Sequence, residues 1–145
     1  MKLLEISPWS CFLAAACILL LPFRLLIAAL ASAVFHELCH LLAMKLFSVP
    51  VLGIRIGAFG MVIRSGYMTP GQELLCAAAG PAGSLFLLLS AEVFPLLAFC
   101  GLIQGLFNLL PIYPMDGGRI LRGLTLLGKE KYLAKRDRNK YNSVE

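Results

Sequence analysis

Two histidines and a glutamate lie close together in the sequence His36-Glu37-Leu38-Cys39-His40. Histidines four residues apart share one face of a helix, so both imidazoles can reach one metal ion. Glu37 follows the first histidine and can hydrogen-bond a metal-bound water without being a ligand itself. Zinc lowers the pKa of such a water toward neutrality, and a carboxylate beside it completes a hydrolytic site. The motif therefore predicts zinc-dependent hydrolysis.

The surroundings of this motif strengthen the metal interpretation. His36 and His40 are the only histidines in the chain, and they lie with Glu37 inside an otherwise apolar segment. An ionisable side chain at membrane depth is costly, and by default it is functional, paired or ligated. The alternative is a histidine that hydrogen-bonds to a neighbouring helix, beside a glutamate without a role.

A third ligand is expected from Asp116, because a catalytic zinc takes three protein ligands and keeps a fourth position open. Asp116 belongs to the segment Asn-Leu-Leu-Pro-Ile-Tyr-Pro-Met-Asp-Gly-Gly-Arg of residues 108–119. The two prolines end the preceding helix, and the two glycines allow backbone conformations closed to other residues. Such broken backbone is tolerated at membrane depth where it faces a polar cavity. Without the two histidines, Asp116 would be interpreted as an ordinary turn residue at the membrane interface.

Membrane-spanning helices are the elements expected to position these residues. Hydrophobic residues make up 59% of the 145 residues and charged residues only 14%, whereas a soluble domain carries about 25% charged residues. A body of this size could not bury so much apolar side chain, so lipid must be the solvent for much of it. A helix needs roughly 20 residues to cross a bilayer. Four apolar segments are candidates by their length: residues 8–21, 25–47, 73–91 and 93–110.

A stretch of different character, residues 49–70, separates the second and third apolar segments. It mixes β-branched residues with glycines, a pattern that predicts one or two short strands, with a plain loop as the alternative. The expected fold class is therefore an all-α polytopic membrane protein. It has about four transmembrane helices and a short β hairpin or strand insertion between the second and third.

Positive charge is concentrated toward the C-terminus. From Arg119 onward there are eight Lys or Arg residues against three acids. We expect a transmembrane core over residues 1–128 and a basic cytoplasmic tail over residues 129–145. Loop charges such as Lys45 and Arg64 fall on the same side as this tail if there are four spans, so both termini are expected to be cytoplasmic. Nucleic-acid binding by the tail is the alternative, and we expect no nucleic-acid partner.

The two motifs together resemble those of the site-2 protease family. The resemblance lies in residues 36–40 and 108–119, and residues 79–84, Ala-Gly-Pro-Ala-Gly-Ser, look like the family's Gly-Pro motif. It covers roughly residues 25–124 and is strongest to the short bacterial branch that includes the stage IV sporulation protease, which processes a pro-sigma factor. Cys39 and Ser84 depart from the pattern, because the family often has glycine and asparagine at these positions.

The resemblance implies an intramembrane zinc metalloendopeptidase that cleaves membrane-associated or single-span proteins in regulated intramembrane proteolysis. His36, His40 and Asp116 would be the zinc ligands, and Glu37 the general base. Asn108 would hold substrate or the developing oxyanion, with a helix-packing amide as the alternative. Residues 1–128 would then form the metalloprotease core.

The resemblance also implies the partners. They are the lipid bilayer of a bacterial cell membrane, a membrane-protein or membrane-associated peptide substrate, and a membrane regulator. Residues 51–63, with Phe59-Gly60, look like the family's membrane-associated strands, whose edge could pair with an unwound substrate segment.

Two other functions compete with proteolysis. A catalytically silent membrane scaffold that binds client proteins would be expected to lose Glu37 or a ligand, and none is lost. A metal transporter would usually carry polar residues along several helices, whereas here Gln104 and Asn108 are nearly the only ones.

Overall fold

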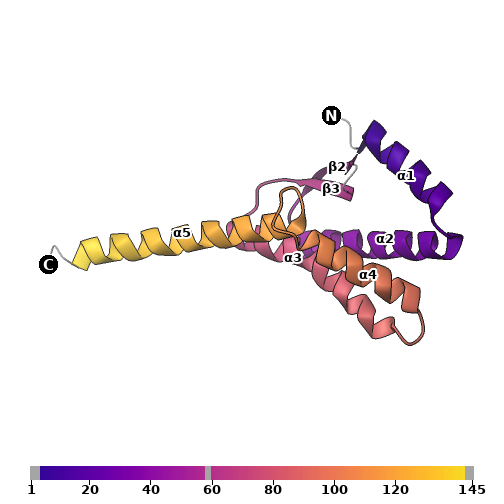
Figure 1. Cartoon of the computed structure of the whole chain (residues 1–145). Helices are drawn as coiled ribbons and strands as arrows, with labels where there is room; N and C mark the ends of the chain where they lie inside the picture. Colours follow the sequence, from indigo (N-terminus) through magenta and orange to yellow (C-terminus); the bar gives the residue numbers. More distant parts are fainter. Residues whose placement is uncertain (1–3, 58–59, 143–145) are drawn as a thin grey trace.

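The computed structural model describes residues 4–57 and 60–142. Phe59 of the expected strand region and the last three residues of the expected tail lie outside these ranges. The described elements, in chain order, are β1 (Leu4–Ile6), α1 (Pro8–Leu20), α2 (Phe23–Leu46), β2 (Val51–Gly57), β3 (Gly60–Ser65), α3 (Pro70–Phe86), the 3-10 helix η1 (Leu87–Ser90), α4 (Pro95–Asn108) and α5 (Asp116–Asn142) (Figure 1).

Each of the four predicted apolar segments forms a helix, and the mostly helical fold class with a hairpin insertion is confirmed. Two of these helical stretches, α2 and Pro70–Ser90, are long and apolar enough to cross a membrane, and α4 is a shorter apolar helix. The number of spans stays a prediction. Proline begins α1, α3 and α4, because at the first helical position its missing N–H costs no hydrogen bond.

The predicted strands form an antiparallel hairpin between α2 and α3. In its register Ile54 lies opposite Ile63, and Gly57 opposite Gly60. A third strand, β1, pairs in parallel with β2, giving the order β1-β2-β3. The sequence did not predict β1, because three residues show no periodicity.

The bundle is polar inside and apolar outside, the reverse of a soluble core. On α2 the apolar side chains Leu30, Val34, Leu38 and Leu42 are exposed, while Ser32, His36 and His40 on the opposite face are buried. The buried hydrophobic residues are mostly small, such as alanine. This distribution suits helices whose outer surface meets lipid. The buried polar groups then have one another as hydrogen-bonding partners.

Close packing of α3 against its neighbours relies on small residues. A Cβ at Gly83 would overlap Sγ of Cys39 on α2, and a Cβ at Gly105 of α4 would lie 3.2 Å from the Cβ of Ser84. Lipid tails are as apolar as leucine, so helix association in a membrane depends on such close contact. The backbone of α3 thereby lies close to both α2 and α4.

The last helix, α5, is continuous from Asp116 to Asn142 and runs through residues 128 and 129, where the sequence placed the start of the tail. Its first part packs on α3, since a Cβ at Gly123 would lie 3.1 Å from the Cβ of Leu74. Its basic second part extends beyond the other elements (Figure 1). The division into core and tail remains a prediction.

We predict that Gly101→Ala destabilises the bundle. The new Cβ would lie 2.7 Å from the backbone oxygen of Ser84, and such overpacking costs about 1–3 kcal/mol. The midpoint of thermal unfolding in detergent should fall. Gly128→Ala is the matched control, because a Cβ there meets nothing within 4 Å and alanine favours the helix by about 1 kcal/mol. Equal midpoints for the two variants would contradict this account of the packing.

Candidate metal centre

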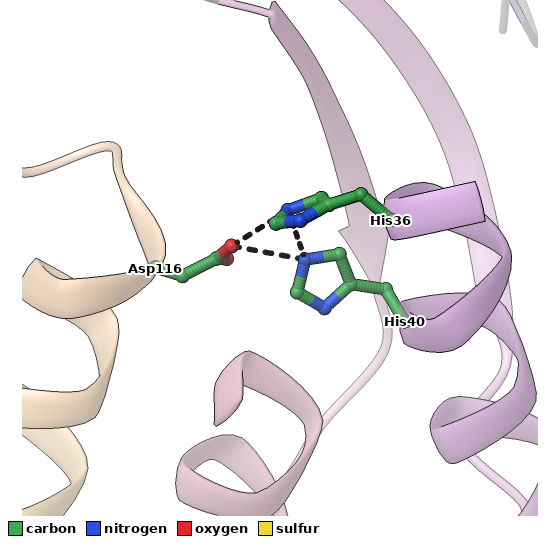
Figure 2. Close-up of side chains that lie close together, drawn as sticks. All are labelled: His36, His40 and Asp116. Atoms are coloured by element: carbon green, nitrogen blue, oxygen red, sulfur yellow. Dashed lines mark hydrogen bonds and ion pairs between the residues drawn. The ribbon is translucent and has the colours of Figure 1, made fainter. Parts of the chain in front are cut away.

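Three polar side chains from two helices converge inside the bundle. Oδ2 of Asp116 lies 3.1 Å from Nε2 of His36 and 3.0 Å from Nε2 of His40, and the two Nε2 atoms are 3.1 Å apart (Figure 2). All three are buried: Asp116 is 6% exposed, His36 2% and His40 5%. Among the described residues they form the only group of at least three His, Cys, Asp or Glu side chains with metal-binding geometry.

The turn between α4 and α5 delivers Asp116 to the histidines. The helix α4 ends at Asn108, residues 109–115 reverse the direction of the chain, and Asp116 begins α5. A Cβ at Gly117 would overlap the backbone of Leu109, and a Cβ at Gly118 would lie 2.7 Å from the backbone N of Tyr113. The two glycines are therefore needed for the first turn of α5 to fold back against this loop. A carboxylate in that turn also interacts favourably with the helix dipole.

The hydrogen bonds of the two rings direct their lone pairs toward Asp116. Nδ1 of His40 lies 2.8 Å from the carbonyl oxygen of Cys76. A carbonyl can only accept, so Nδ1 donates and Nε2 of the neutral ring carries a lone pair. Nδ1 of His36 lies 2.8 Å from Oγ of Ser84, which accepts when His36 has the same tautomer. Three electron-pair donors then face one another with no proton between them. A cation bound among them would remove the repulsion between their lone pairs.

The spacing of the three atoms fits zinc. Bonds of about 2.0–2.1 Å in a tetrahedron place neighbouring ligand atoms about 3.3 Å apart, and the observed separations are 3.0–3.1 Å. The remaining carboxylate oxygen, Oδ1 of Asp116, lies 3.7 Å from Nη1 of Arg119. One oxygen thus faces the histidines while the other faces a cation one helical turn away, which fixes the orientation of the carboxylate.

The other predicted site residues occupy different surroundings. Glu37 is half-buried and lies within electrostatic reach of both histidines, Asp116 and Arg119. Asn108 is the last residue of α4, and its Nδ2 donates to the backbone carbonyl of Gln104 at 3.1 Å. The structure therefore brings together the three expected ligands and Glu37, whereas Asn108 is hydrogen-bonded within its own helix.

Three supporting groups were not predicted from the sequence: Ser84, the carbonyl of Cys76 and Gly80. Ser84 is fully buried behind His36. A Cβ at Gly80 would overlap Nε2 of His40 and lie 2.7 Å from Nε2 of His36. The Gly-Pro motif marks this part of α3, but only the packing of α3 on α2 reveals which of its residues face the rings.

We predict that Ser84→Ala weakens zinc binding. Its hydroxyl holds the ring nitrogen of His36 that faces away from the metal position, and loss of such a partner costs about 10–100-fold in metal affinity. Competition with a chromophoric chelator in detergent would measure the change. Ser90→Ala is the control, because Ser90 bonds to the carbonyl of Leu87 within η1. Unchanged affinity in Ser84→Ala would show that this hydrogen bond does not support the ligand.

Known proteins share this sequence and fold. The profile of Peptidase family M50 matches residues 83–144. The zinc metalloprotease MJ0392 of Methanocaldococcus jannaschii is 33% identical over 114 residues, which cover 69% of this chain and 34% of that protein. Rip3 of Mycobacterium tuberculosis, also named as a zinc metalloprotease, is 36% identical over 112 residues, 64% of this chain and 28% of that protein. The chain thus spans about a third of the length of these relatives.

A solved structure agrees with the sequence comparisons. The site-2 protease from Methanocaldococcus jannaschii superposes with a TM-score of 0.71 at 29% identity, covering 84% of this chain and 66% of that one. These names do not mention sporulation, so the resemblance to the sporulation branch stays a prediction. The long apolar helices and this family together indicate an integral membrane protein. The chain belongs to peptidase family M50, the site-2 proteases.

Proposed function

We propose that this protein is an intramembrane zinc metalloendopeptidase that hydrolyses peptide bonds of membrane-associated or single-span proteins. The observation that carries the proposal is the buried convergence of Nε2 of His36, Nε2 of His40 and Oδ2 of Asp116 within an apolar bundle. A zinc ion bound there supplies Lewis acidity and lowers the pKa of a coordinated water.

Each residue of the site has a role in this proposal. His36, His40 and Asp116 hold the ion, and Glu37 accepts the proton of the attacking water and returns it to the leaving amine. Glu37 is suited to this because it is adjacent to a ligand on α2 and half-buried. Arg119 faces the second oxygen of the Asp116 carboxylate and orients it. A silent scaffold would not need this complete set.

The sheet supports a role in substrate binding. The strand β2 pairs with β1 on one side and β3 on the other, so β3 lies at an edge of the described sheet. A peptide bond inside an intact helix is shielded from a nucleophile, and an extended segment could add to a strand edge. Asn108, at the end of α4, would hold this segment or the developing oxyanion. Such a substrate fits regulated intramembrane proteolysis, in which a membrane regulator would control access.

We also propose the arrangement in the membrane. Four spans in a bacterial cell membrane put both termini, the β2–β3 hairpin and the basic half of α5 in the cytoplasm. Lys45 is in the last turn of α2, and α5 carries most of the basic residues. Both ends fit the excess of Lys and Arg on the cytoplasmic side of membrane proteins.

Metal content and cleavage should respond differently to changes in the ligands and the base. Purified wild type should carry about one zinc per chain. Asp116→Ala should lose zinc and activity together, whereas Glu37→Gln should keep zinc and lose cleavage because an amide cannot accept the proton. Atomic absorption and cleavage of a tagged single-span protein would measure both. Turnover by Glu37→Gln near the wild-type rate would rule out the mechanism, and full zinc in Asp116→Ala would remove that ligand.

The topology can be tested by cysteine labelling from each side of the membrane. Single cysteines at Ser65, Glu92 and Lys135 in a cysteine-free background would be reacted with an impermeant maleimide. Ser65→Cys and Lys135→Cys should react from the cytoplasm, and Glu92→Cys from outside. If Ser65→Cys and Lys135→Cys react from opposite faces, the four-span arrangement has to be abandoned.

A further inference from the structure

A second polar pair lies inside the bundle, one helical turn from the metal centre. Oγ of Ser32, which is 0% exposed, donates to Oε1 of Gln104 on α4 at 2.7 Å. Ser32 precedes His36 by four residues, so it lies on the same face of α2 as the two histidines. The hydrogen bond therefore holds the carboxamide of Gln104 at the level of Ser32, about 6 Å from the level of His36 along α2.

The pair leaves hydrogen-bonding groups available on α4. A glutamine side chain has an acceptor oxygen and two N–H donors. The oxygen of Gln104 is occupied by Ser32, and over residues 4–57 and 60–142 no acceptor for its Nε2 is found; the side chain is half-buried. Asn108 follows one turn later, and its Nδ2 donates to the backbone of Gln104. Its side-chain oxygen is an acceptor one helical turn from Gln104.

An extended peptide is the ligand that this pattern matches. Successive outward-facing C=O and N–H groups on one edge of a strand repeat every two residues, about 6.6–6.8 Å. Residues i and i+4 of a helix are about 6 Å apart along its axis. In an apolar environment every unpaired backbone group of an unwound segment costs several kcal/mol. A donor followed one turn later by an acceptor can satisfy two of these groups.

We propose that Gln104 is a substrate-binding residue whose Nε2 donates to a backbone carbonyl of an unwound substrate segment, next to the metal centre. This inference rests on the proposed proteolytic function and specifies the conformation of the substrate at the site. Gln104 recognises backbone, so it selects for an interrupted helix and not for a particular side chain. Ser32 positions the carboxamide with its N–H groups directed away from α2.

The test measures binding in the Glu37→Gln background, so that no cleavage is needed. Two fluorescein-labelled peptides of about 20 apolar residues serve as probes: one is an uninterrupted Leu/Ala helix, and the other has a central Pro-Gly break. Binding is followed by fluorescence anisotropy in detergent. This background is compared with the same protein carrying Ser32→Ala/Gln104→Met, because removing both partners leaves no buried unpaired hydroxyl.

Loss of the Gln104 amide should weaken binding of the broken peptide about three- to tenfold, the range for one hydrogen bond. Binding of the uninterrupted peptide should not change, since its carbonyls are already bonded. Ile103→Met, on the exposed side of α4, should alter neither. Equal weakening for both peptides, or none for either, would overturn the proposal and leave Gln104 as a helix-packing residue. Binding of the broken peptide without cleavage by zinc-loaded wild type would count only against the proteolytic function.

Discussion

The structure depends on keeping three strongly polar groups inside an apolar bundle. An ionised carboxylate or an unpaired imidazole nitrogen is costly to bury unless it is paired, bonded or ligated. Asp116 and the two histidines meet this requirement only together, at 3.0–3.1 Å. The outer ring nitrogens take further partners from α3, namely Oγ of Ser84 and the carbonyl of Cys76. Much of the helix packing follows from bringing these groups together.

Small residues make that arrangement sterically feasible. The two halves of the site are 76 and 80 residues apart in the sequence, and the error allowed in metal–ligand distances is about 0.2 Å. Gly80 lets α3 pass close to the Nε2 atoms of both rings, and Gly117 lets the first turn of α5 fold against the preceding loop. Because glycine lacks a Cβ, these approaches need no adjustment of larger side chains. The precision of the site therefore comes from backbone contacts, which are less adaptable than side-chain contacts.

Sequence reasoning succeeded where the signal is local. The spacing of His36 and His40, the four apolar segments and the glycine-punctuated strands can each be read within a few neighbouring residues. It did not predict β1, whose three residues are defined by pairing with a strand 50 residues away. Nor did it predict that α5 continues through the basic segment, because charge indicates a side of the membrane and not a conformation. Ser84 was missed because its role depends on the rotation of α3 about its axis.

The position of Asp116 at the very start of α5 has a mechanical consequence. A ligand at the end of a 27-residue helix is attached to a rod about 40 Å long. The rod meets α3 closely at Gly123, which lies about 10 Å from the ligand along the axis. Tilting the rod by only about 1° around that contact shifts the ligand by roughly 0.2 Å, the whole tolerance of a metal–ligand distance. A rigid tilt of α5 would thus act as a lever on the metal centre, and it would link the geometry of the site to the distant basic end of the helix.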